Sequence, residues 1–197
     1  GGGTTDFSLI AVLEHDGELA LERIAVGDHI LLGGDNMDLT LAHAQKVKLE
    51  AAGHTLDAFQ LRALMHACRT AKELLLADEG APPAVPVVVA SRGAKLVGST
   101  LRTELTRDEA LGTLVEGFLP QVASNSSPAQ RPRSALTQLG LPYAQDAAIT
   151  RHLAAFLSRQ AGAGGELPIY RHPGATFLHP TAVLLNGGVL KAGPVAR

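Results

Sequence analysis

The sequence predicts an α/β protein with a mixed sheet and flanking helices, beside a second region of helices and one hairpin. Three observations predict this class. Short β-rich stretches come first, apolar residues then recur at helical spacing over two longer stretches, and turn residues separate these blocks. The order of strands, helices, hairpin, helices and strand suits an α/β or α+β protein.

The first thirty residues predict a three-part antiparallel meander. Thr5–Leu13 is β-rich, and Asp16-Gly17 then separates it from a second apolar run at Glu18–Val26. An Asp-Gly pair between two such runs favours a tight hairpin, because both turn positions need positive φ. Gly27-Asp28 precedes the short third segment, His29–Leu32.

Two helices are predicted next. The first spans Asn36 to about Glu50, with Asp35 or Asn36 as its cap, and the second spans Thr55–Ala77. Cys68 lies on the apolar face of the second helix, which predicts a buried thiol. A hairpin is expected to follow, with strands at Val85–Ala90 and Lys95–Leu101.

The last third of the sequence alternates helix and loop. A helix is predicted to open at Leu105-Thr106-Arg107, with Thr106 and Glu109 as a capping box, and to end near Leu119. A polar loop at 124–133 and a helix at Ala147–Gln160 follow. Thr181–Leu185 is expected to be a short buried strand.

Composition excludes several classes of protein. The 197 residues are 46% hydrophobic and 18% charged, which is typical of a globular chain. A net charge of −2 gives no basic footprint for nucleic acid, and one cysteine excludes a disulfide framework. The chain has no run of eighteen apolar residues that would predict a membrane span, and it shows no leader. We therefore expect a cytoplasmic protein. Because the chain opens on Gly1-Gly2-Gly3-Thr4 without a methionine, we expect a longer parent protein.

Three glycine clusters are the candidate ligand-binding segments: Gly1-Gly2-Gly3-Thr4, Gly33-Gly34-Asp35 and Asn186-Gly187-Gly188. Glycine lets backbone N–H groups converge on an anion, and the Thr4 hydroxyl adds a donor. Asp6 is a candidate magnesium ligand acting through water. For any one cluster alone, a simple tight turn is the competing interpretation.

Five segments resemble the DnaK-type seventy-kilodalton heat-shock chaperones, in particular a divergent bacterial branch. The opening glycine motif resembles the family's second phosphate motif, and Leu32–Asp38 resembles the segment that follows it. Further matches lie at Ala67–Lys72, Leu105–Arg107 and Val183–Gly188. The five segments come in the family's order and cover nearly the whole chain, least clearly from Ala123 to Thr176.

The resemblance implies a fold. It implies the second lobe of an actin-like ATPase domain, which is ribonuclease H-like and is itself divided into two subdomains. The nucleotide-facing subdomain would comprise residues 1–38 and 177–197, and would be incomplete at its C-terminus. Residues 39–176 would form the helical and hairpin subdomain, with an insertion atypical of the family around 123–146.

The resemblance also implies a site for ATP or ADP with magnesium. Gly2, Gly3 and Thr4 would contact the terminal phosphates, and Asp6 would help to hold the metal. The remaining nucleotide-binding positions would be Gly33, Gly34, Lys72, Gly187, Gly188 and Lys191. Four positions depart from the family's adenosine site: Arg69, Glu73 and Leu76 replace a glutamate, an arginine and a serine, and Lys191 replaces a stacking arginine.

The function implied is that of a fragment of an ATP-binding chaperone, contributing one wall of a nucleotide cleft. Its partners would be the first lobe of the same domain and a co-chaperone or nucleotide-exchange factor. No catalytic residue is predicted in this chain, so the parent would be the ATPase and the isolated chain would be inactive. The alternatives are a lobe of a sugar kinase, or of a non-enzymatic actin-like filament or scaffold protein.

Overall fold

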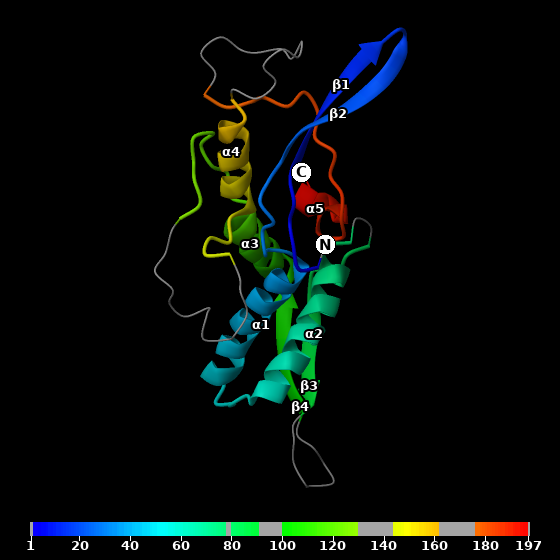
Figure 1. Ribbon diagram of the computed structural model, residues 1–197. Coiled ribbons are helices and arrows are strands. Elements are labelled where there is room, and N and C mark those ends of the chain that lie inside the picture. The colour runs from blue at the N-terminus through cyan, green and yellow to red at the C-terminus, as the bar shows by residue number, and fades with distance from the viewer. Residues whose placement is uncertain (1, 78–79, 91–99, 130–143, 162–175, 197) are drawn as a thin grey trace. The chain divides into compact units, whose positions relative to one another are not determined.

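The computed structural model describes residues 2–77, 80–90, 100–129, 144–161 and 176–196 (Figure 1). The chain forms two compact units. Unit 1 comprises Gly1–Gly3, Gly33–Phe118 and Leu185–Arg197, and unit 2 comprises Thr4–Leu32 and Leu119–Leu184. The described elements are helices and two small antiparallel sheets, so the α/β class is confirmed. The subdomain division at residues 1–38 with 177–197 and 39–176 stays a prediction.

Unit 1 is built from two long helices packed on a hairpin. Helices α1 (Gly34–Ala51) and α2 (Ala58–Leu75) lie side by side against strands β3 (Ala84–Ala90) and β4 (Thr100–Thr106), as Figure 1 shows. Helix α3 (Arg107–Phe118) follows β4 directly. The apolar faces of these elements form one core, which includes Met37, Leu41, Leu49, Leu64, Cys68, Leu75, Val87, Val89, Leu101, Leu105, Leu114 and Phe118.

The predicted burial of Cys68 is confirmed, because its side chain is fully enclosed. Burial raises the pKa of the thiol to about 12, and the negative charge of Asp38 adds to the effect. At neutral pH the thiol is therefore neutral, and it acts as a small apolar core group.

The second hairpin strand differs from its prediction. Residues 91–99 lie outside the described part of the chain, and β4 runs from Thr100 to Thr106 instead of ending at Leu101. In the antiparallel register Leu101 pairs with Val89 and Leu105 with Val85. The strand continues because Leu101 and Leu105 both reach the core, and this alternation outweighs the local helix signal at Leu105.

The two helix starts in unit 1 have different outcomes. At α3 the predicted capping box is confirmed: the Glu109 N–H donates to Thr106 Oγ1 at 3.2 Å, and the Thr106 N–H donates to Glu109 Oε2 at 3.0 Å. At α1 the expected cap at Asp35 or Asn36 is wrong, because Gly33 is the N-cap. The Asn36 side chain instead accepts a hydrogen bond from the Gly33 N–H at 2.8 Å.

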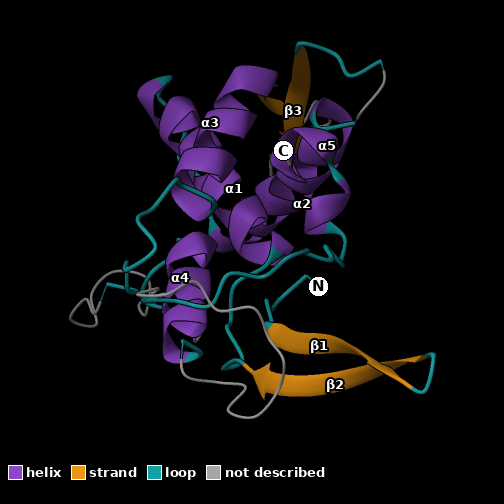
Figure 2. Cartoon of the chain, turned by 90° about the horizontal axis from the view of Figure 1, so that it is seen from above, coloured by secondary structure: helices purple, strands orange, loops and turns teal. Residues whose placement is uncertain are grey.

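Unit 2 contains the predicted first hairpin. Strands β1 (Ser8–His15) and β2 (Glu18–Val26) pair antiparallel and form the long twisted ribbon in Figure 2. Asp16 and Gly17 have φ of 54° and 85°, so the Asp-Gly turn is confirmed. Of the third predicted segment, His29–Leu32, only Ile30 pairs, through a single bridge to Thr5.

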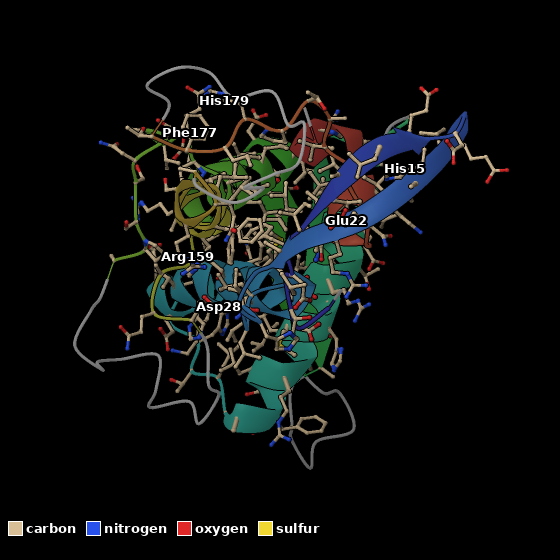
Figure 3. All side chains as sticks on the ribbon, turned by 45° about the horizontal axis from the view of Figure 1, so that its top comes forward. His15, Glu22, Asp28, Arg159, Phe177 and His179 are labelled. Carbon is tan, nitrogen blue, oxygen red and sulfur yellow. The ribbon has the colours of Figure 1, made fainter. Side chains whose placement is uncertain are left out.

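Helix α4 (Ile149–Arg159) confirms the helix predicted at Ala147–Gln160. Phe156 on this helix stacks on Phe7, with ring centroids 5.7 Å apart. At the end of the helix, Arg159 Nη2 lies 3.1 Å from Asp28 Oδ2, and Figure 3 labels both residues. These contacts join α4 to the opening segment of the chain within unit 2.

The predicted strand at Thr181–Leu185 is wrong. The segment forms no strand in the sheets that the structure describes, and Leu184 is 94% exposed. Its apolar residues were expected to be buried, but sheet pairing depends on a partner strand that local sequence does not specify. A short 3₁₀ turn (Val189–Lys191) and helix α5 (Gly193–Ala196) follow. None of the described helices has the length and apolar character needed to cross a membrane.

Candidate ligand pocket in unit 1

Unit 1 contains a pocket of about 350 Å³, hereafter the unit 1 pocket. It lies where the first turns of α1, the last turns of α2 and the segment after Gly187 meet, with Leu114 of α3 also in its wall. Its volume falls at the lower end of the range of about 300–1,000 Å³ typical of small-molecule sites. The lining residues are Gly2, Gly34, Asp35, Met37, Asp38, Arg69, Lys72, Glu73, Leu76, Ala77, Leu114, Gly188, Val189, Lys191, Ala192 and Val195.

Five residues predicted to bind nucleotide line this one pocket. They are Gly2, Gly34, Lys72, Gly188 and Lys191. All four positions that depart from the chaperone pattern line it too: Lys191, already named, and Arg69, Glu73 and Leu76. Residues from widely separated parts of the sequence therefore line one pocket, and their binding of a common ligand stays a prediction.

The other three glycines predicted in unit 1 lie outside the lining. Gly33 is the N-cap of α1, and a Cβ at Gly3 would lie 4.0 Å from Asp35 Oδ2. Gly187 has φ of 103°, a conformation that L side chains rarely adopt, so it forms the turn before the lining segment. These glycines shape the backbone beside the unit 1 pocket.

Thr4 and Asp6, the remaining two predicted residues, belong to unit 2. The Thr4 hydroxyl lies 3.4 Å from Asp6 Oδ2, and Asp6 Oδ1 lies 2.6 Å from His29 Nδ1. No group of three or more metal-ligating side chains occurs among the residues that the structure describes. The role predicted for Asp6 in holding magnesium through water stays a prediction.

Close backbone approach shapes the pocket at the start of α1. The Asp35 N–H donates to the Gly2 carbonyl at 2.8 Å, which fixes the opening glycines beside the helix. A Cβ at Gly34 would lie 3.5 Å from Val189 Cγ2 and 3.8 Å from Lys72 Nζ. Glycine at position 34 therefore leaves room between the first turn of α1 and the lysine.

Opposed charges line the unit 1 pocket. Lys72 Nζ lies 2.5 Å from Asp38 Oδ1, and both side chains are largely buried. Burial raises the pKa of the Asp38 carboxyl above its ordinary value, although the Lys72 ammonium acts in the opposite direction. Nearer to solvent, Arg69 Nε lies 3.2 Å from Glu73 Oε1, one turn apart on α2.

This lining suits a ligand with both polar and apolar parts. Lys72, Lys191 and Arg69 supply donors for anionic or hydroxyl oxygens, and the N-terminus of α1 adds a positive dipole end. The carboxylates accept hydrogen bonds from hydroxyl or amino groups. The apolar part of the wall is formed by Met37, Leu76, Leu114, Val189 and Val195.

Asp38 is the site residue whose role sequence reasoning missed. The motif around it was recognised, but no binding role was given to its side chain. Its signal is its place on α1, because it shares the buried face of Leu41, Ala42, Gln45 and Leu49. A carboxylate on the buried face of a helix requires a charged or hydrogen-bonding partner, and that requirement points to a site.

In comparisons with known proteins, no family model matches this chain, and no curated protein matches it significantly.

Proposed function

We propose that this chain is one nucleotide-binding wall of a DnaK-like, ATP-dependent chaperone with an actin-like ATPase fold. One observation carries the proposal: five residues that the resemblance assigns to nucleotide line a single pocket in unit 1. They come from the opening glycines, the start of α1, the end of α2 and the segment at 188–191. A chance set of glycines and lysines from four segments has no reason to share one lining.

The ligand in this proposal is ATP or ADP with magnesium. Donors at Lys72 and Lys191, with the N-terminus of α1, suit the oxygen-rich part of a nucleotide. The apolar part of the lining suits a base, whereas Arg69, Glu73 and Leu76 make the pocket unlike the family's adenosine site. Magnesium would be held through water by Asp6, as the resemblance implies.

The isolated chain binds nucleotide weakly and does not hydrolyse it. Phosphoryl transfer depends on charges and positioned groups on both sides of the phosphates, and the first lobe of the domain would supply the other side. That lobe is the proposed principal partner, with a co-chaperone or nucleotide-exchange factor as a further one. The parent protein in this proposal is cytoplasmic.

The proposal is tested by titrating Mg-ADP into the ¹⁵N-labelled chain and following amide shifts by NMR, which detects weak binding. We expect shifts to concentrate at Gly34, Gly188 and the last turn of α2. Lys72→Ala should weaken binding by about tenfold to hundredfold, because a hydrogen bond to a charged group contributes about 1.5–3 kcal/mol.

The matched control is Lys46→Ala. Lys46 also sits on a helix of unit 1 and pairs with Glu50 at 2.6 Å, but it does not line the pocket, so its removal should leave the affinity unchanged. The proposal is overturned if Mg-ADP moves no pocket amide even when the chain is joined to its first lobe. Sugar-stimulated phosphoryl transfer by the parent would favour the sugar kinase instead.

A further inference from the structure

The ion pair between Asp38 and Lys72 lies at the wall of the unit 1 pocket, and it is unusually buried. The Asp38 side chain is 5% exposed and that of Lys72 is 13% exposed, whereas both partners of the Arg69–Glu73 pair are more than half exposed. Lys72 Nζ and Asp38 Oδ1 are 2.5 Å apart, and both residues line the pocket.

Stability alone does not explain this pair. Removing two charges from water costs several kcal/mol for each ion, and apolar side chains of similar size are often as stabilising. The packing of α1 on α2 already has apolar residues at Leu41, Leu64 and Leu75. A buried charged pair that faces a pocket is therefore a candidate for a ligand-binding role.

The position of the ammonium group explains why a carboxylate is needed beside it. Lys72 Nζ lies only 3.8 Å from where a Cβ of Gly34 would be, so it sits against the first residue of α1. The N-terminus of a helix carries partial positive charge and repels a cation. Asp38, one turn into the same helix, offsets this repulsion and holds the ammonium in place.

An ammonium group has three N–H donors, and Asp38 Oδ1 accounts for one close contact. Because Lys72 lines the pocket, its other donors are available to a ligand there. In the first turn of α1, the N–H groups of Asp35, Asn36 and Met37 already donate to the carbonyls of Gly2 and Gly33, so the donors left for a ligand here come from Lys72. We propose that Asp38 is a positioning residue, which holds the Lys72 ammonium beside the first turn of α1 so that it binds an acceptor oxygen of the ligand.

This inference rests on the proposed function, because the ligand that it assigns to Lys72 is the nucleotide. It adds a role for Asp38, which acts through Lys72 and does not need to touch the ligand. A residue that acts only through another has a characteristic signature: once its partner is removed, its own removal has no further effect on binding.

The test is a double-mutant cycle in the whole chain, read by NMR titration with Mg-ADP. The variants are Asp38→Asn, Lys72→Met and the two combined. Asp38→Asn keeps the shape and one acceptor oxygen but removes the charge, and we expect it to weaken binding about tenfold. In the Lys72→Met background the same change should weaken binding no further.

Two further variants separate positioning from a purely structural role. Asp38→Glu keeps the carboxylate and should recover part of the lost affinity. Glu50→Gln makes the same change of charge in the more exposed Lys46–Glu50 pair and should leave the affinity unchanged. Amide spectra and thermal unfolding of each variant show whether it is folded, and the combined variant removes both charges, so it leaves neither ion buried alone.

The outcomes are distinct. The inference is supported if the combined variant binds Mg-ADP no more weakly than Lys72→Met alone and if Asp38→Glu recovers part of the affinity that Asp38→Asn loses. Unchanged binding in Asp38→Asn, or a further loss when it is added to Lys72→Met, overturns the inference alone. If the unmodified chain binds no Mg-ADP at all, even when joined to its first lobe, the proposed function falls and this inference falls with it.

Discussion

At the scale of single residues, Asp146 organises the segment that enters α4. Its carboxylate accepts hydrogen bonds from the N–H groups of Ala129 at 2.7 Å and Ala148 at 2.9 Å, and Arg151 Nη1 lies 2.9 Å from Oδ2. Burial acting alone would raise the pKa of Asp146, but these donors outweigh it and hold the pKa below its ordinary value. One carboxylate thus joins two loop segments of unit 2 to the first turn of α4.

We predict that Asp146→Asn lowers the free energy of unfolding by about 1–3 kcal/mol at pH 7, because the buried donors lose a charged acceptor. The lowered pKa means that the unfolded chain takes up this proton first as the pH falls. The stabilisation by Asp146 is therefore complete above its ordinary pKa of about 4 and is lost as the pH falls toward the folded pKa.

Urea unfolding of both proteins at pH 7 and pH 3 measures this difference. The difference in the free energy of unfolding between wild type and Asp146→Asn should be smaller at pH 3 than at pH 7. The matched control is Asp28→Asn, which removes a carboxylate from the exposed pair with Arg159 and should cost less than about 1 kcal/mol. The prediction is contradicted if this difference in the free energy of unfolding is larger at pH 3 than at pH 7, or if Asp28→Asn destabilises the chain more than Asp146→Asn does.

At the scale of elements, α3 has a start that is specified by its own sequence. Thr106 and Glu109 exchange hydrogen bonds across the first turn, and Glu109 Oε1 also lies 2.6 Å from Lys48 Nζ of α1. The hydrogen bond from Lys48 lowers the pKa of Glu109 below its ordinary value, with the Thr106 contacts adding to it. The capping box therefore also links α3 to α1 within unit 1.

Thr106→Ala should lower the free energy of unfolding of unit 1 by about 1 kcal/mol, because the Glu109 N–H loses its side-chain acceptor. Thr106→Ser keeps that acceptor and should lie close to wild type. Amide hydrogen exchange in α3 and thermal unfolding measure both variants. If the serine variant is as unstable as the alanine variant, the loss comes from packing of the threonine methyl group and not from the cap.

Local sequence was sufficient where an element carries its own signals. Asp16-Gly17 predicted the first hairpin, and the spacing of apolar residues predicted α1, α2 and α4. It failed at Thr181–Leu185, because an apolar, β-rich segment becomes a buried strand only when another strand is placed to pair with it. The cap of α1 was misplaced for a related reason: Asn36 bonds to Gly33 from inside the helix, and spacing does not distinguish that role from a cap.

The candidate site, like the fold, was predicted only in part from the sequence. The glycines and Lys72 were predicted from motifs, and five of the nine predicted nucleotide-binding residues line one pocket. Asp38 was not identified as the partner of Lys72, because the two residues lie on different helices and only the packing of α1 on α2 brings them together. Pair interactions of this kind require tertiary structure.

At the scale of the whole molecule, the predicted binding residues are divided between the two units. The unit 1 pocket is lined by unit 1 residues alone, whereas Thr4 and Asp6 belong to unit 2. In the proposed function, the isolated chain would therefore bind a nucleotide chiefly through unit 1. The predicted roles of Thr4 in phosphate binding and of Asp6 in metal binding stay predictions.

This division predicts an uneven response to ligand in hydrogen exchange followed by mass spectrometry. A ligand stabilises the region that it binds by an amount that grows with the logarithm of its concentration above Kd. Saturating Mg-ADP should therefore slow exchange in the first turns of α1, the last turn of α2 and residues 188–196. Exchange in β1, β2 and α4 of unit 2 should stay unchanged. The Lys72→Ala variant at the same ligand concentration should lose the protection and serves as the control. Equal protection of the β1–β2 hairpin would show that binding couples both units, and would contradict a site confined to unit 1.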